Sequence, residues 1–201
     1  MRLAFTAIPL WLALLPLAAY LVVIGSFHLR RRPVLVAGPV DGALLAAGVS
    51  GLVMAGPLAL LQPLAGTSPW TAVAFLAACV IMLAFAILAT RPRIVIYNIG
   101  LDRLRPVVAE LVGCLDPAAR WAGETAALPS RGLQIHLDDR GPARCVSVIA
   151  AGSRPATEAW SEFSRHLRRG IATIEVRRSP WAGYALFALA AAVVAASWAV
   201  S

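Results

Sequence analysis

RRRPVLVAGPVDGALL, residues 30–45, is the stretch that decides how this chain is organised. It places a single carboxylate, Asp41, in an otherwise apolar run directly after three arginines. Inside a bilayer an acidic side chain is a candidate functional site. In the first turn of a helix, by contrast, it favours the positive end of the helix dipole. The choice between these alternatives depends on where the helix that contains Asp41 begins.

The overall composition indicates a membrane protein. Hydrophobic residues make up 60% of the 201 residues and charged residues only 14%, with a mean hydropathy of +0.77. Such values lie outside the usual range of soluble domains. All 18 basic residues are arginine, which is typical of a GC-rich bacterial genome. The three cysteines have neither CxxC nor zinc spacing, so we expect thiols in a reducing compartment.

Four segments are apolar over the roughly 20 residues that a membrane-spanning helix needs. They are residues 4–25, 41–62, 69–90 and 180–199. The fold class predicted is therefore a membrane all-α protein with three transmembrane helices in 1–90 and a fourth in 179–201. The first segment is followed by Phe27, His28 and three arginines, a stop-transfer pattern that distinguishes it from a cleaved signal peptide.

Arginine placement predicts the orientation of the helices. Arginines follow the first and third segments and precede the fourth, and the flanking set is Arg30, Arg31, Arg32, Arg91, Arg93, Arg177 and Arg178. By the positive-inside rule, residues 91–178 are cytoplasmic and both termini lie outside, in a bacterial inner membrane. The same arginines form a basic collar for anionic lipid head groups.

Residues 91–178 predict a small cytoplasmic α+β domain. The expected elements are a strand over 93–97, a helix from about 102 to 115 capped by Asp102, one or two short strands over 121–128, a hairpin over 133–150, and a helix from 155 to 169 ended by Gly170. Each helix is apolar along one stripe. The pattern fits an antiparallel sheet with two helices on one face.

Three sequence motifs carry a resemblance to a known group of proteins: IVIYNIGLDRLRPVVAELV (94–112), RWAGE (120–124) and LPSRGLQIHL (128–137). An amphipathic helix with a tryptophan and a final apolar segment follow them. Over about 91–200 the chain resembles uncharacterised multi-pass membrane proteins of planctomycete bacteria. The resemblance implies an architecture and no known activity.

Ser50 lies in the tetrad Gly48-Val49-Ser50-Gly51, which matches the GxSG serine motif of rhomboid intramembrane proteases. Such a serine needs a base, usually a histidine on another transmembrane helix. The three histidines, His28, His136 and His166, are all predicted outside the spans. The alternative is helix packing through small residues spaced four apart, and we favour it. The small-residue ladders are Gly38, Gly42 and Ala46, and Ala43, Ala47, Gly51 and Ala55.

His136 is the other candidate site. The predicted hairpin, with its turn at 139–142, places His136 opposite Cys145 and near Asp138, which together offer metal-ligand chemistry. Structural zinc sites, however, use four ligands at paired spacing. We therefore expect a solvent-facing polar row, and no metal or cofactor. No P-loop, GxGxxG, HExxH or paired-carboxylate motif occurs.

The leading functional hypothesis is a non-enzymatic interaction or assembly subunit of a membrane complex. Its expected partners are other membrane subunits, or a second copy bound through the small-residue helix faces, and no nucleic acid, because no recognised nucleic-acid module occurs. A transporter or channel component using Asp41 and Ser50 is the alternative, and a membrane hydrolase using Ser50 is the third.

Asp41 itself is predicted at a helix start. Counting back about 20 residues from Leu61 reaches Gly42, so the second helix begins near Pro39. Asp41 then lies in its first turn at the cytoplasmic interface, with Val34 to Gly38 along the membrane surface. Arg30 to Arg32 are the expected ion-pair partners of Asp41.

Overall fold

The computed structural model describes residues 10–61, 69–88, 91–139, 141, 144–152, 157–176 and 180–199. The chain divides into two compact units. The helical unit comprises Met1–Gly25, Gly42–Ala89 and Tyr184–Ser201. The α+β unit comprises Ser26–Asp41 and Thr90–Gly183. The α+β unit is therefore built from two separate segments of the chain, of which the first carries the arginine triplet and Asp41.

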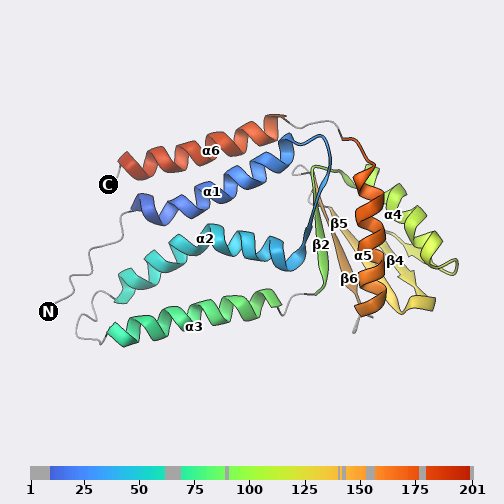
Figure 1. Cartoon of the computed structure of the whole chain (residues 1–201), viewed down its shortest axis with the longest axis horizontal. Helices are drawn as coiled ribbons and strands as arrows, with labels where there is room; N and C mark the ends of the chain where they lie inside the picture. Colours follow the sequence, from blue (N-terminus) through green and yellow to red (C-terminus); the bar gives the residue numbers. More distant parts are fainter. Residues whose placement is uncertain are drawn as a thin grey trace. The chain divides into compact units, whose positions relative to one another are not determined.

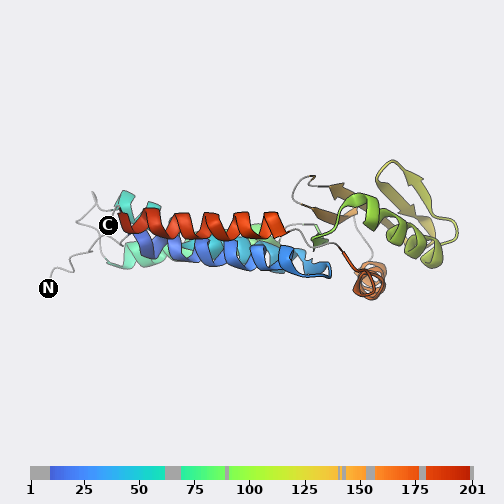
Figure 2. The same cartoon turned by 90° about the horizontal axis from the view of Figure 1, so that it is seen from above.

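Long apolar helices occur at the four places predicted, and most of their residues belong to the helical unit. They are α1 (Leu10–Leu29), α2 (Gly38–Leu61), α3 (Pro69–Leu88) and α6 (Pro180–Ala199). α1 and α6 lie side by side in both Figure 1 and Figure 2, and the rings of Trp11 and Trp198 are 6.4 Å apart between centroids. α1 continues to Leu29, so His28 lies in its last turn and not beyond it.

Two of these helices are long and apolar enough to cross a membrane over the part of the chain that the structure describes. They are α1, over Trp11–Leu29, and α6, over Pro180–Ala199. α2 and α3 contribute shorter apolar stretches, Gly38–Val53 and Val73–Ala86. Of the four helices predicted to span a membrane, α1 and α6 are thus long enough over their described residues.

The α+β unit contains a six-stranded antiparallel sheet with the order β1-β2-β6-β5-β4-β3. Its strands are β1 (Val34–Ala37), β2 (Arg93–Tyr97), β3 (Arg120–Ala122), β4 (Thr125–Leu128), β5 (Leu133–Asp139) and β6 (Cys145–Ala151). The predicted strand at 93–97 and the two short strands broken near Gly123 are confirmed. Gly123 has φ +61°, a left-handed turn conformation that favours glycine.

Strand β1 is the main difference from the sequence prediction. Residues 34–38 were expected along the membrane surface, but Val34–Ala37 pairs with β2, from Val34 opposite Tyr97 to Ala37 opposite Ile94. Val36 is buried and Leu35 packs against the core. A strand of four apolar residues is too short to show the alternation that identifies a half-buried strand.

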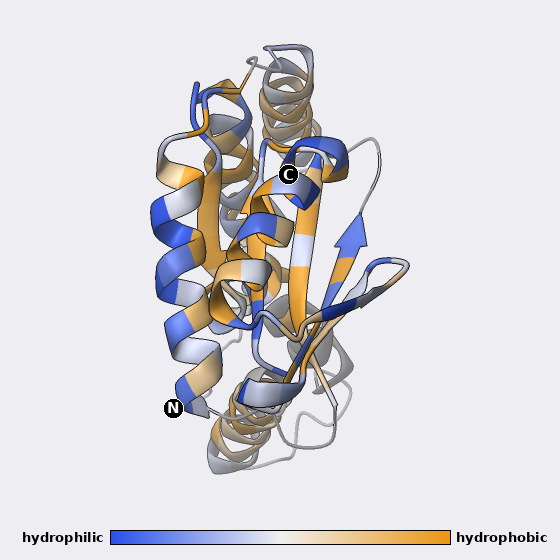
Figure 3. Cartoon of the chain, turned by 90° about the vertical axis from the view of Figure 1, so that its right-hand side faces the viewer, coloured by the Kyte–Doolittle hydropathy of each residue, from blue (hydrophilic) through white to orange (hydrophobic). Residues whose placement is uncertain are grey.

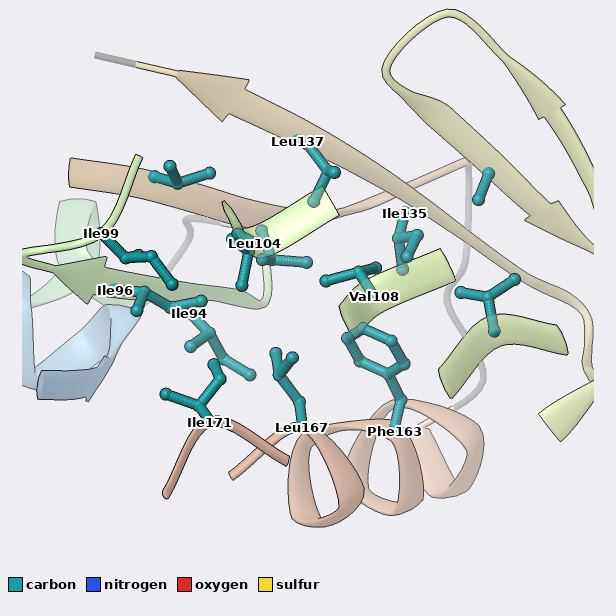
Figure 4. Close-up of a cluster of buried hydrophobic side chains, with 14 of the residues drawn as sticks. Ile94, Ile96, Ile99, Leu104, Val108, Ile135, Leu137, Phe163, Leu167 and Ile171 are labelled. Atoms are coloured by element: carbon teal, nitrogen blue, oxygen red, sulfur yellow. The ribbon is translucent and has the colours of Figure 1, made fainter. Parts of the chain in front are cut away.

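Two helices, α4 (Leu101–Leu115) and α5 (Thr157–Ala172), lie on the same side of the sheet (Figure 2). Each presents one apolar stripe to the core, as its sequence spacing predicts, and Figure 3 shows the hydrophilic outer side of α5. In Figure 4 the α5 side chains point towards the residues of the sheet and of α4. The residues at the centre are Ile94, Ile96, Leu104, Val108, Ile135, Leu137, Phe163, Leu167 and Ile171.

The ends of both helices differ from the predictions. The residue that precedes α4 is Gly100, so Asp102 belongs to the first turn and does not cap the helix. Gly170 does not end α5, which runs on to Ala172. A Cβ at Gly170 would stand 3.4 Å from Cγ1 of Val107, so Gly170 allows a close approach of α5 to α4.

Asp116, directly after α4, is buried and ties this helix to the short 3-10 turn η2 (Pro129–Arg131). Its carboxylate accepts hydrogen bonds from the Ala118 amide (2.9 Å), the Ser130 amide (2.9 Å) and the Ser130 hydroxyl (3.0 Å). Burial alone would raise the pKa of Asp116. The hydrogen bonds and the nearby Arg131 charge outweigh burial, so its pKa lies below the usual value.

Candidate functional site

Asp41 lies in the first turn of α2, as predicted, and this turn follows β1 without an intervening loop. Its side chain is buried and contacts two residues of β2. The Tyr97 hydroxyl donates a short hydrogen bond to Oδ1, and Arg93 Nη2 lies 3.3 Å from Oδ2. Arg93 and Tyr97 lie on the same face of β2 because alternate strand residues share a face. Both oxygens of Asp41 are therefore engaged by donors from the neighbouring strand.

Gly38 makes room for this contact. A Cβ at Gly38 would stand 2.9 Å from the Arg93 carbonyl oxygen and would overlap the Arg93 side chain. Any larger residue at this position would force Arg93 or the start of α2 to move. The glycine that begins α2 thus allows Arg93 to pass and reach Asp41.

The last turn of α1 joins the same cluster through Tyr97. The Tyr97 ring lies 5.5 Å from that of Phe27 and 6.5 Å from that of His28 between centroids. Asn98 follows β2, is fully buried, and has φ 66°. Its Nδ2 donates to the Arg30 carbonyl at 2.7 Å. We refer to His28, Asp41, Arg93, Tyr97 and Asn98 as the junction cluster.

The junction cluster retains unused hydrogen-bonding capacity. Within the described part of the chain, His28 Nδ1, Arg93 Nε and Asn98 Oδ1 are buried polar atoms without a hydrogen-bond partner. Buried polar atoms are normally satisfied by protein or by ordered water. The two charged groups of the cluster, Asp41 and Arg93, bind each other.

Two sequence assignments change here. Asp41 was expected to pair with Arg30 to Arg32, but its ion-pair partner is Arg93. Arg93, assigned to the basic collar, is half-buried in the junction cluster, whereas Arg30, Arg31, Arg32 and Arg91 are exposed. Arg177 and Arg178 lie outside the described residues. Only the pairing of β1 with β2, which the sequence did not indicate, brings Arg93 to Asp41.

Ser50 lies within α2 and its hydroxyl donates to the Ala47 carbonyl of the same helix at 2.7 Å. The two glycines of the GxSG tetrad pack against α1. A Cβ at Gly48 would stand 2.7 Å from Tyr20 Cβ, and one at Gly51 would overlap the Ala13 carbonyl. The tetrad thus makes close helix contact, in the manner of small-residue packing.

His136 does not face Cys145. The hairpin register pairs His136 with Ile149 and Asp138 with Ser147, while Cys145 pairs with Tyr97 of β2. The error arises because the β5–β6 connection is longer than the predicted 139–142 turn. His136 Nδ1 lies 3.0 Å from the Thr125 hydroxyl. Among the described residues, no three His, Cys, Asp or Glu side chains are placed to hold a metal ion.

No disulfide joins the three cysteines. Cys145 is buried in the α+β unit, Cys79 is half-buried on α3, and Cys114 is exposed on α4. Cys114 is therefore the thiol best placed to react with a reagent in solution.

The fold and the site define a chain with an antiparallel α+β unit and apolar helices, two of which are long enough to cross a membrane. No protein-family model, curated protein or solved structure significantly matches the chain.

Proposed function

We propose that this chain is a four-pass protein of a bacterial inner membrane that acts as a non-enzymatic interaction or assembly subunit. α1, α2, α3 and α6 are its membrane helices, and residues 91–178 are its cytoplasmic domain. The observation that carries this proposal is the junction cluster. Its buried charged and polar groups bind the end of α1 and the start of α2 to the sheet, and so serve the architecture and not a substrate.

The exposed surface of the apolar helices supports the membrane assignment. The exposed fractions are 76% for Trp70, 72% for Phe85 and 78% for Trp181. Apolar surface of this extent indicates contact with lipid or with another protein. Four tryptophans, Trp11, Trp70, Trp181 and Trp198, lie near the ends of α1, α3 and α6. Tryptophan is enriched at membrane–water interfaces, where its ring is apolar and its N–H is hydrated.

Cys114 offers a direct test of the orientation. A chain with Cys79→Ala and Cys145→Ala retains only this exposed thiol. A membrane-impermeant maleimide is expected to label it in permeabilised cells and not in intact cells. Labelling in intact cells would show that residues 91–178 lie outside.

The assembly role is tested by purification of the full chain in mild detergent after chemical cross-linking in native membranes. We expect cross-linked species and co-purifying membrane proteins, or a defined homo-oligomer. A monodisperse monomer without partners, in membranes that were cross-linked efficiently, would contradict the proposal.

A transporter component is the second candidate, favoured by the buried carboxylate of Asp41 in the first turn of an apolar helix. Reconstituted vesicles distinguish the two. Solute or proton flux that is lost in Asp41→Asn, while the variant still folds and inserts, would favour transport. The absence of flux across a broad solute panel favours the assembly role.

A further inference from the structure

Arginines from two distant parts of the chain meet at one end of the sheet. Arg30, Arg31 and Arg32 precede β1, and Arg144 precedes β6. The register aligns Val34, Tyr97 and Cys145 across β1, β2 and β6, so β1 and β6 begin at the level where β2 ends. The residues that precede β1 and β6 therefore lie at the same end of the sheet as Asn98 and Ile99, which follow β2.

Hydrogen bonds to their backbone carbonyls hold Arg30, Arg31 and Arg144 in place. The Arg30 carbonyl accepts from Asn98 Nδ2 at 2.7 Å, and the Arg144 carbonyl accepts from the Ile99 amide at 3.0 Å. Arg30 and Arg144 are thus hydrogen-bonded to Asn98 and Ile99, which are consecutive in the chain. The Arg31 carbonyl accepts from the Val176 amide at 3.0 Å. A site whose backbone is already ordered loses less conformational entropy when it binds a ligand.

The arginine side chains before β1 have no acidic partner among the residues that the structure describes. Arg30, Arg31 and Arg32 are exposed, and none of them forms an ion pair with a described residue. Arg93 and Arg131, in contrast, pair with Asp41 and Glu162. Glu175, an exposed carboxylate, precedes Val176, whose amide donates the hydrogen bond to Arg31. Three exposed guanidinium groups without an ion-pair partner among the described residues therefore lie at this end of the sheet.

The start of α4 adds to the positive potential. Gly100 precedes this helix and has no side chain that could cap it, and it follows Asn98 and Ile99 directly. The N-terminus of a helix carries partial positive charge and favours anions. Asp102, in the first turn, offsets part of this effect.

We propose that Arg30, Arg31, Arg32 and Arg144 bind the phosphate group of an anionic lipid. Guanidinium groups bind phosphate oxygens through paired hydrogen bonds. The source is a lipid head group because the triplet follows directly on the apolar helix α1, and the inference therefore rests on the proposed membrane location. Arg91 and Arg93 do not belong to this site, since they lie at the opposite end of β2 and Arg93 is paired with Asp41.

The test uses the full chain in mild detergent, titrated with phosphatidylglycerol or phosphatidylcholine and observed by native mass spectrometry. Membrane-surface contacts of basic residues correspond to about fivefold in affinity each. We expect phosphatidylglycerol to bind at least about tenfold more tightly than phosphatidylcholine, and Arg31→Gln/Arg32→Gln to remove most of this preference. The matched control is Arg165→Gln/Arg168→Gln, an equal charge change on the exposed side of α5.

Arg144→Gln provides a second variant, because Arg144 does not flank a membrane helix in the sequence and joins the site only in the folded chain. It is expected to weaken phosphatidylglycerol binding by about fivefold. An unchanged lipid preference in both site variants, an equal loss in the control, or full competition by inorganic phosphate would overturn the proposal. Alkaline carbonate extraction separates the two proposals: a chain that stays in the membrane but lacks lipid preference refutes the lipid site alone.

Discussion

Asp41 and Tyr97, separated by 56 residues, form a buried hydrogen bond between the first turn of α2 and the last residue of β2. The bond exists because β1, which leads directly into α2, is paired with β2. Together with the Arg93 contact, it holds Asp41, in the part of α2 that belongs to the α+β unit, against β2.

Tyr97→Phe removes the hydroxyl and leaves Asp41 Oδ1 without this donor. The loss of a buried hydrogen bond to a charged group is expected to cost about 1–3 kcal/mol of stability. Thermal unfolding in detergent measures it. The control is Tyr184→Phe, because the Tyr184 side chain is 63% exposed. Equal unfolding temperatures for the two variants would contradict a stabilising role of the buried Tyr97 hydroxyl.

Gly38→Ala inserts a methyl group against the Arg93 carbonyl and side chain. Overpacking of this kind typically costs about 1–3 kcal/mol. We expect a lower unfolding temperature, measured by the same thermal scan. The matched control is Gly113→Ala in α4, where a Cβ meets nothing within 4 Å and helix propensity improves by roughly 0.5–1 kcal/mol. The two glycine-to-alanine changes should therefore act in opposite directions.

Gly51→Ala is expected to disturb the packing of α2 on α1, because the new Cβ would overlap the Ala13 backbone. A loss of about 1–3 kcal/mol is typical of such overpacking. Ser50→Ala should change stability little, since its hydroxyl bonds only within α2. Thermal unfolding of each variant in detergent, followed by circular dichroism, compares their stability. Covalent labelling of the wild type by a serine-directed probe, lost in Ser50→Ala, would instead support a hydrolase.

The lowered pKa of Asp116 predicts that part of the stability of the folded chain is lost in acid. Its pKa is lower in the folded chain than in the unfolded chain, so the ionised form favours folding. This contribution is present above the unfolded pKa of about 4 and is lost as the pH falls through the lower folded value. Asp116→Asn should be less stable at neutral pH and should lose less stability between about pH 5 and pH 3. Asp102→Asn, at an exposed carboxylate, is the control, and an identical acid response in the two variants would exclude this role of Asp116.

Much of the α+β unit was predictable because its signals are local. The apolar spacing of Leu104 and Val108, and of Phe163 and Leu167, determines which helix face is buried. The left-handed turn at Gly123 separates two short strands where the pattern breaks. The hairpin register was not predictable, because the length of the β5–β6 connection decides which residue faces His136.

The candidate site was predicted in part. The position of Asp41 in a first helical turn follows from the length of the apolar segment and from Gly38-Pro39 at its beginning. The sequence did not predict the partners of Asp41, because Arg93 and Tyr97 come close to it only when β1 pairs with β2. The polar atoms of His28 and Asn98 that have no hydrogen-bond partner among the described residues are likewise a consequence of burial.

By itself, the sequence determined the apolar helices, the two amphipathic helices and most strands, since hydrophobic length and periodicity act over short distances along the chain. Only the tertiary structure decided that Val34–Ala37 is a strand and that Asp41 pairs with Arg93. It also decided that Arg30 and Arg144 lie at the same end of the sheet. These contacts join residues far apart in the chain, and strand pairing and burial create them without leaving a local pattern.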